Sequence, residues 1–96
     1  MTAYWISIYK QITDEAKVAA YAELAGPALR DAGGTYVARG LPEVTYEAGE
    51  ETRTVIIAFE SVDAARAAHD SPGYQDALSA LDGGAVRDMR IVPGVD

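Results

Sequence analysis

Hydrophobic and polar positions change their period along the chain, and these changes mark out the secondary structure. Residues 3–9 (AYWISIY) are mostly β-branched and aromatic, which predicts a strand. Apolar side chains then recur at helical spacing up to the glycine pair 33–34, so a helix is expected from a Thr13 N-cap to those glycines. Pro27 removes one backbone donor, which predicts a kink or a break within this helix.

The rest of the chain continues with two strands, a helix and a strand. Residues 35–40 and 52–60 predict a hairpin with an acidic tip, and residues 43–46 are expected to continue its first strand beyond a bulge. Ser61 and Ser71 are the N-caps of a helix in two parts, which the next glycine pair ends, and residues 85–92 predict the last strand.

The resulting order, βαββαβ, predicts the fold class. Right-handed crossovers and an adjacent hairpin fold this order into an α+β, ferredoxin-like domain. We expect residues 1–96 to form one such domain, with a four-stranded antiparallel sheet and two helices on one face.

The pattern also predicts apolar side chains on both faces of the sheet. Residues 55–59 are apolar at every position, and the first strand places Tyr4, Ile6 and Ile8 on one face and Trp5 and Tyr9 on the other. Because two helices cover only one face, we expect a homodimer in which a second copy covers the other. The alternative is a monomer whose outer face stays wet.

Four stretches in matching order carry a resemblance to a known family. They are Tyr4-Trp5-Ile6, 33–40 (GGTYVARG), 53–61 (RTVIIAFES) and 71–75 (SPGYQ). Together they resemble the domain-of-unknown-function family numbered 1330, from Tyr4 to about Gly94. Members often carry an arginine where this chain has Leu81, and their hairpin Glu-Gly is stretched here to Glu47-Ala48-Gly49.

The resemblance implies a fold and an assembly. The family is similar to the dimeric α+β barrels, whose members include cofactor-independent monooxygenases, muconolactone isomerases and haem-handling enzymes. It therefore supports the homodimer but supplies no established activity, because function does not follow from fold.

Composition and charge exclude several classes of function. The chain has no cysteine, which excludes a disulfide scaffold and a thiolate metal site. Its formal net charge is −7. Neither nucleic acid nor an anionic membrane is an expected partner, because both require a cationic surface. No apolar run approaches the length of a membrane span and no signal peptide is visible, so a cytoplasmic location is expected.

Three residues are predicted to be catalytic: His69 as base, Arg39 as anion clamp and Tyr74 as orienting donor. His69 is the only histidine, a side chain type that titrates near neutrality, and it suits a general acid/base or a haem ligand. The alternative is a structural histidine at a helix C-terminus. Tyr74 is equally well placed to pack in the core. The alternative for Arg39 is an ion pair with a glutamate: Glu43, Glu47 or Glu60.

Trp5, Tyr36 and Arg53 are predicted to bind a ligand. The rings of Trp5 and Tyr36 suit a flat substrate, but in a dimer they also suit an interface. Arg53 alternatively forms a solvated pair with Glu50 or Glu51. The acidic hairpin lacks the ligand spacing of an EF-hand, so neither a metal site nor a cofactor is predicted.

Two hypotheses for function follow. The first is a homodimeric barrel that binds a small hydrophobic or aromatic acid between helices and sheet, with proton transfer or cofactor-independent oxygenation as its chemistry. The second is a non-enzymatic ligand-binding or structural dimer.

Overall fold

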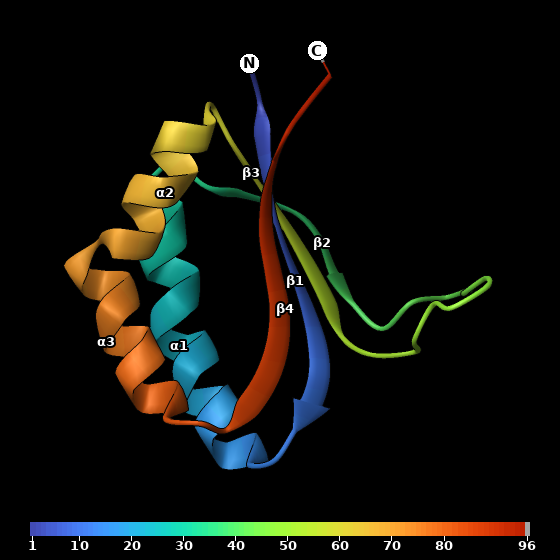
Figure 1. Ribbon diagram of the computed structural model, residues 1–96. Helices are drawn as coiled ribbons and strands as arrows, with labels where there is room; N and C mark the ends of the chain where they lie inside the picture. The colour runs from blue at the N-terminus through green and yellow to red at the C-terminus, as the bar shows by residue number, and fades with distance from the viewer. Residues whose placement is uncertain (96) are drawn as a thin grey trace.

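The computed structural model describes residues 1–95 and shows a sheet with helices on one face (Figure 1). The elements are β1 (Ala3–Ile12), α1 (Glu15–Asp31), β2 (Thr35–Gly40), β3 (Thr54–Phe59), α2 (Val62–Asp70), α3 (Pro72–Leu81) and β4 (Ala85–Pro93).

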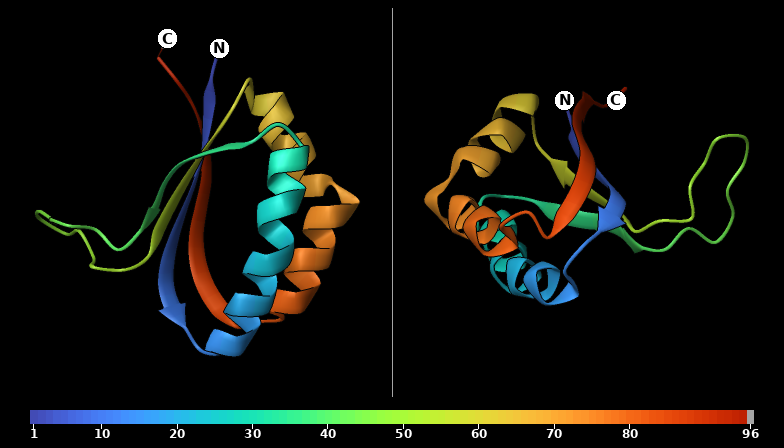
Figure 2. Two further views of the ribbon diagram at one scale, coloured as in Figure 1. Left: turned by 180° about the vertical axis from the view of Figure 1, so that it is seen from behind. Right: turned by 60° about the horizontal axis from the view of Figure 1, so that its bottom comes forward.

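The sheet confirms the predicted ferredoxin-like fold. Its strand order is β2-β3-β1-β4, and every neighbouring pair is antiparallel. All three helices cover the same face, as the views from both sides show (Figure 2). No helix within residues 1–95 is long and apolar enough to cross a bilayer.

The start of α1 differs from the prediction, and no break interrupts its middle. The N-cap is Asp14, whose side chain accepts from the Lys17 backbone, whereas the Thr13 hydroxyl donates to the Gly83 carbonyl at 3.0 Å. The helix also continues without a break through Pro27. Gly26 explains this continuity, because a residue without Cβ relieves the clash that a following proline ring causes in helical backbone.

The second helical segment follows its predicted caps. The Ser61 hydroxyl accepts from the Ala64 backbone at 3.0 Å, and the Ser71 hydroxyl accepts from the Tyr74 backbone at 3.3 Å. Pro72 occupies the first turn of α3, so the serine-proline pair divides the segment into α2 and α3.

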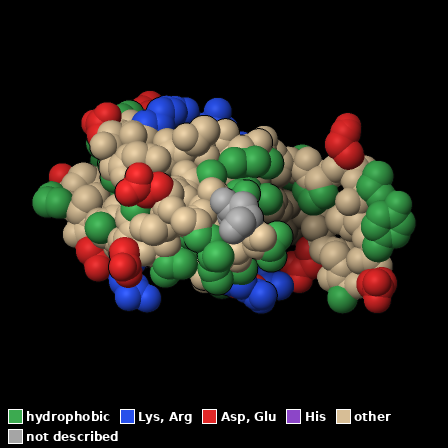
Figure 3. Space-filling view, turned by 90° about the horizontal axis from the view of Figure 1, so that it is seen from above, with side chains coloured by type: hydrophobic (Ala, Val, Ile, Leu, Met, Phe, Trp, Pro, Cys, Tyr) green, Lys and Arg blue, Asp and Glu red, His purple; other side chains and the backbone are tan. Residues whose placement is uncertain are grey.

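Residues 41–53 form a projecting arm between β2 and β3, and the prediction that 43–46 continue the strand is wrong. Pro42 lacks the donor that a ladder requires, and the chain leaves the sheet there. Three large side chains on the arm are mostly exposed: Leu41, Val44 and Tyr46. The arm extends away from the helices (Figures 1 and 2), and hydrophobic side chains gather on it in the space-filling view (Figure 3).

The central strands carry apolar side chains on both faces, as predicted, and burial alternates between the two faces. Trp5 and Tyr9 face the helices and are buried, whereas Tyr4, Ile6 and Ile8 face the opposite side and are only partly buried. The residues of β3 that pair with β1 also alternate between buried and partly buried. The helix-facing side thus holds the core, and the other face, called the open face below, carries apolar side chains that no helix covers.

Candidate functional site

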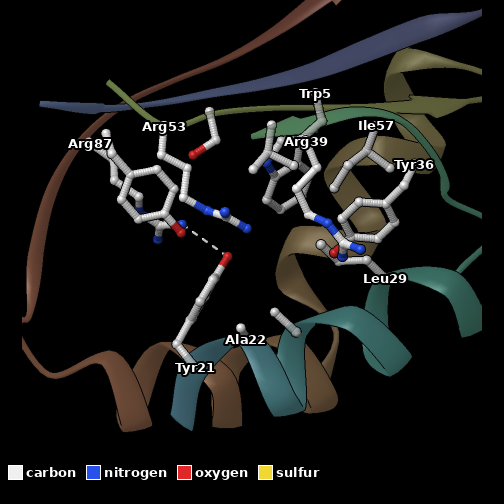
Figure 4. A pocket seen from close by; sticks show the side chains of 13 residues that line it. Trp5, Tyr21, Ala22, Leu29, Tyr36, Arg39, Arg53, Ile57 and Arg87 are labelled. Atoms are coloured by element: carbon white, nitrogen blue, oxygen red, sulfur yellow. Dashed lines mark hydrogen bonds between the residues drawn. The ribbon is translucent and has the colours of Figure 1, made fainter. Parts of the chain in front are cut away.

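A pocket lies between α1 and the helix-facing side of the sheet (Figure 4). It encloses about 50 Å³ of free space, and about 410 Å³ when its open mouth is included. Residues from five elements and the arm line it: Trp5, Ser7, Tyr9, Tyr21, Ala22, Ala25, Leu29, Tyr36, Arg39, Arg53, Val55, Ile57 and Arg87. We call it the arginine–tyrosine pocket.

The pocket is cationic although the protein is acidic. Three of the six arginines line it, and no aspartate or glutamate does. Within residues 1–95, Arg39, Arg53 and Arg87 form no ion pair, whereas Arg66 pairs with Asp63 and Arg90 with Asp88. The pocket therefore concentrates positive charge whose carboxylate partner is not supplied by the described part of the chain.

Tyrosine rings hold these guanidinium groups in place. Arg87 lies over the rings of Tyr21 and Tyr9, with its central carbon 4.6 Å and 5.6 Å from their centroids, and Arg53 lies 5.9 Å from the Tyr9 centroid. On the other side of the pocket, Arg39 lies 5.1 Å from the ring centroid of Tyr36. Such contacts orient a guanidinium and leave its donors free for an anion.

A buried hydrogen-bond chain forms one wall of the pocket. The Arg87 Nη1 donates to the Tyr21 hydroxyl at 2.9 Å, and that hydroxyl also lies 2.9 Å from the Tyr74 hydroxyl. Burial, with the neighbouring Tyr74, raises the pKa of Tyr21 far above its ordinary value. Burial acts to lower the pKa of Arg87, but the Tyr21 hydroxyl outweighs it and that pKa lies above its usual range. At neutral pH Arg87 therefore keeps its positive charge and Tyr21 keeps its phenolic proton.

Four of the six predicted site residues line this pocket. Trp5, Tyr36, Arg39 and Arg53 converge on it (Figure 4). Burial raises the pKa of Tyr36 against the opposing effect of the nearby arginines, so its hydroxyl is neutral at physiological pH.

The alternative ion pairs of the two predicted arginines do not form within residues 1–95. Glu50 instead pairs with Lys10 at 2.9 Å, and Arg53 turns toward Tyr9. Arg39 likewise contacts an aromatic ring rather than one of the three glutamates. Both guanidinium groups are thus available at the mouth of the pocket.

The other two predicted residues lie elsewhere. Tyr74 is fully buried (0% exposed) and reaches the pocket only through Tyr21. The His69 side chain is 42% exposed, bonds to Asp70 at 3.0 Å and lines a separate groove beside β4. Trp5 lines both hollows, so its ring stands between His69 and the arginine–tyrosine pocket. The structure therefore does not bring the predicted trio together, and its catalytic role stays a prediction.

Among the pocket residues that sequence reasoning missed, three carry polar side chains that meet in its wall or floor: Ser7, Tyr21 and Arg87. A signal for Ser7 was present, because it interrupts the buried apolar positions of β1 between Trp5 and Tyr9. Arg87 faces the helices at a position where its strand neighbours Met89 and Ile91 are apolar. In the sequence, Tyr21 is one of the apolar positions at helical spacing, and only the fold shows that its hydroxyl meets Arg87.

The described residues 1–95 contain no cluster of three or more histidine, aspartate and glutamate side chains that could hold a metal ion. What the pocket offers chemically is a set of guanidinium and hydroxyl donors between aromatic walls, which suits a planar anion.

Several solved structures share the fold at low sequence identity. A protein of unknown function from Rhodopseudomonas palustris matches with a TM-score of 0.69 and 20% identity, over 95% of this chain and 78% of that one. A structure described as a dimeric ferredoxin-like protein of unknown function, from Jannaschia sp. CCS1, matches with a TM-score of 0.71 and 15% identity, over 98% and 100%. The cofactor-independent oxygenase SnoaB from Streptomyces nogalater matches with a TM-score of 0.63 and 14% identity, over 99% and 93%.

These identities establish similarity of fold and nothing about activity. A comparison with curated proteins gives no significant match. The family model described as domain of unknown function (DUF1330) matches residues 2–95, almost the whole chain. The protein therefore belongs to the DUF1330 family.

Proposed function

We propose that this protein is a homodimeric small-molecule-binding protein that takes a small hydrophobic or aromatic carboxylate in the arginine–tyrosine pocket. One observation carries the proposal: three arginines without carboxylate partners in the described chain face one aromatic-walled pocket. In a chain with 15 acidic residues, leaving these arginines unpaired requires a reason, and an external anion supplies one.

The pocket matches both halves of such a ligand. A guanidinium binds a carboxylate through two parallel hydrogen bonds, and each hydrogen bond to a charged group contributes about 1.5–3 kcal/mol. The rings of Trp5 and Tyr36 and the side chains of Leu29 and Ile57 offer an apolar surface to the rest of the molecule. A ring-sized ligand requires the exposed Arg39 side chain at the mouth to swing outward.

Two features support the homodimer. The open face carries partly exposed apolar side chains, among them Ile6 and Ile56, which lie opposite each other in the sheet. The arm adds Tyr46, which is 80% exposed. A second copy laid on the open face removes such surface from water at about 25 cal/mol per Å². The Jannaschia protein, described as dimeric, has the same fold.

Whether the dimer is also an enzyme is a separate part of the proposal. A cofactor-independent oxygenase or an isomerase of a small acid is supported by the fold shared with SnoaB. A non-enzymatic ligand-binding dimer is the second candidate, and it is favoured by the position of His69, which lies outside the pocket.

The binding proposal is tested with the fluorescence of Trp5, the only tryptophan, which is 2% exposed and lines the pocket. Benzoate is expected to change the emission and to bind at least about tenfold more tightly than benzyl alcohol, because only benzoate carries the charge that the arginines recognise. His69→Ala serves as the control and is expected to leave the benzoate affinity within about twofold. Equal affinities for the acid and the alcohol, or no binding of either, would contradict the proposal.

Benzoate affinity in the wild-type protein is expected to be flat between about pH 6 and about pH 9. Arginine keeps its charge throughout this range, benzoate keeps its own, and burial raises the pKa of Tyr21, so the Tyr21 hydroxyl stays protonated there. His69 lines the other groove and is not expected to affect the binding. Benzoate titrations at several pH values check the prediction, and a clear step in affinity within this range would contradict it.

The assembly is tested by sedimentation. At low micromolar concentration we expect one species with twice the 10.2 kDa mass of the chain, because a single helical layer leaves the open face uncovered. A concentration series is the control, since the mass of a weak dimer falls on dilution. A 10.2 kDa species throughout the series would refute the homodimer.

A further inference from the structure

Ser7 is a polar residue at the centre of the core side of the sheet. It lies on β1, the strand with neighbours on both sides, opposite Val55 on β3 and Met89 on β4. It is 3% exposed and is the one buried polar residue among the core residues of the described chain. Its hydroxyl has no hydrogen-bond partner within residues 1–95, and it lines the arginine–tyrosine pocket.

Such a hydroxyl does not benefit the fold. A buried hydroxyl without a partner costs about 1–3 kcal/mol, whereas alanine has nearly the same shape and no polar atom to satisfy. Because folding alone favours alanine at this position, the serine indicates a partner that enters the pocket from outside. Residues that break a local rule of core composition cluster at functional sites.

Tyr21 offers a second neutral donor to the same pocket. Its oxygen accepts from Arg87 and lies 2.9 Å from the fully buried Tyr74 hydroxyl, and either hydroxyl of this pair can be the donor. When Tyr74 donates to Tyr21, both lone pairs of the Tyr21 oxygen are occupied and its own proton is free. That proton is then available to an oxygen atom in the pocket, toward which the Tyr21 side chain points (Figure 4).

Arg53 and Ser7 stand at different levels along the sheet, whereas Arg39 pairs with Val55, which lies opposite Ser7, and so shares the level of Ser7. Arg53 shares the level of Tyr9, whose backbone N–H donates to the Arg53 carbonyl at 2.9 Å, whereas Ser7 lies two residues farther along β1. Two residues of a strand span about 7 Å. A ligand that reaches both levels therefore carries two polar groups separated by roughly the width of an aromatic ring.

We infer that Ser7 and Tyr21 form an inner neutral subsite of the pocket, and that the preferred ligand is an aromatic acid with a hydroxyl or carbonyl oxygen remote from its carboxylate. The carboxylate binds Arg53 at the mouth, and the second oxygen binds the hydroxyls of Ser7 and Tyr21. This inference rests on the proposed function, because it assumes that the arginine–tyrosine pocket takes the carboxylate.

The test compares benzoate with its three monohydroxy derivatives by Trp5 fluorescence and calorimetry. We expect 3- or 4-hydroxybenzoate to bind about fivefold or more tightly than benzoate, as one or two added hydrogen bonds require, and 2-hydroxybenzoate to gain nothing because its hydroxyl stays beside the carboxylate. Ser7→Ala is expected to remove most of this preference and to keep or raise the melting temperature.

Thr52→Val is the matched control. Thr52 is the other residue of the described chain with a buried hydroxyl lacking a partner, and it does not line the pocket. This variant is expected to keep the full preference for the hydroxylated acid. Tyr21→Phe is expected to reduce the preference without abolishing benzoate binding.

The outcomes separate the inference from the proposed function. If benzoate binds but no hydroxylated isomer binds more tightly, the inner subsite is refuted while the carboxylate pocket stands. If Ser7→Ala keeps the preference, Ser7 is not part of the subsite and the inference is again refuted. If benzoate does not bind at all, the proposed function itself fails.

Discussion

Replacing both Arg39 and Arg53 by glutamine is expected to weaken benzoate binding by about 100-fold. Both guanidinium groups line the pocket, and neither has a carboxylate partner within residues 1–95, so the ligand carboxylate is the anion that they serve. A charged hydrogen bond of about 1.5–3 kcal/mol corresponds to about tenfold in affinity or more for each arginine. Fluorescence titration of Trp5 measures the loss, and each single variant is expected to lose about tenfold.

The free energy of unfolding of this double variant is expected to fall only slightly, although its affinity for benzoate falls strongly. The two arginines contribute contacts with the rings of Tyr36 and Tyr9, which are worth about 0.5–1 kcal/mol each at exposed sites. The matched control replaces Lys17 and Arg66 by glutamine, which changes the net charge equally but removes two cations that already pair with aspartates away from the pocket. Equal losses of affinity in the two double variants would show a general charge effect and overturn the pocket assignment.

The fold was predictable because local signals and the global pattern agree. Ser61, Ser71 and the glycine pairs mark helix ends in the sequence, and the β-branched and aromatic residues of β1 and β3 mark the central strands. The errors fall where tertiary contacts override such signals. Thr13 has the chemistry of an N-cap, but its hydroxyl donates to the carbonyl of Gly83, just before β4. Asp14 is therefore the N-cap of α1.

The site was only partly predictable, for a physical reason. Arg39 and Arg53 stand at strand ends, and their place at the mouth of a cavity follows from the topology. The meeting of Tyr21 with Arg87 depends on how α1 lies across β4, which no spacing in the sequence encodes. His69 drew attention through its chemistry alone, although its position at the end of α2 directs it into a different groove from the arginines.

Replacing Gly34 by alanine is expected to destabilise the protein strongly, because the turn at this glycine has no room for a side chain. Gly34 joins α1 to β2, and its backbone N–H donates to the Leu29 carbonyl at 2.8 Å. A Cβ at this position would lie 2.8 Å from the Phe59 ring and 2.9 Å from both an Ile57 methyl group and the Leu29 carbonyl oxygen. Phe59 and Ile57 are buried and the carbonyl is backbone, so none of the three can move aside at low cost.

The expected loss is about 3 kcal/mol or more, which is the upper range for overpacking of a core and corresponds to a fall of more than about 10 °C in the melting temperature of a domain of this size. Gly33→Ala is the control at the neighbouring position. Nothing lies within 4 Å of its added Cβ, so its cost comes only from the backbone φ of +96° and is expected to be about 1–2 kcal/mol.

Because Gly34 sets the start of β2, which carries Tyr36 and Arg39, the Gly34→Ala protein that remains folded is also expected to bind benzoate more weakly than the Gly33→Ala protein. Thermal unfolding and Trp5 fluorescence measure both effects, and a Gly34→Ala variant as stable as Gly33→Ala would contradict the close packing of α1, β2 and β3 at this turn.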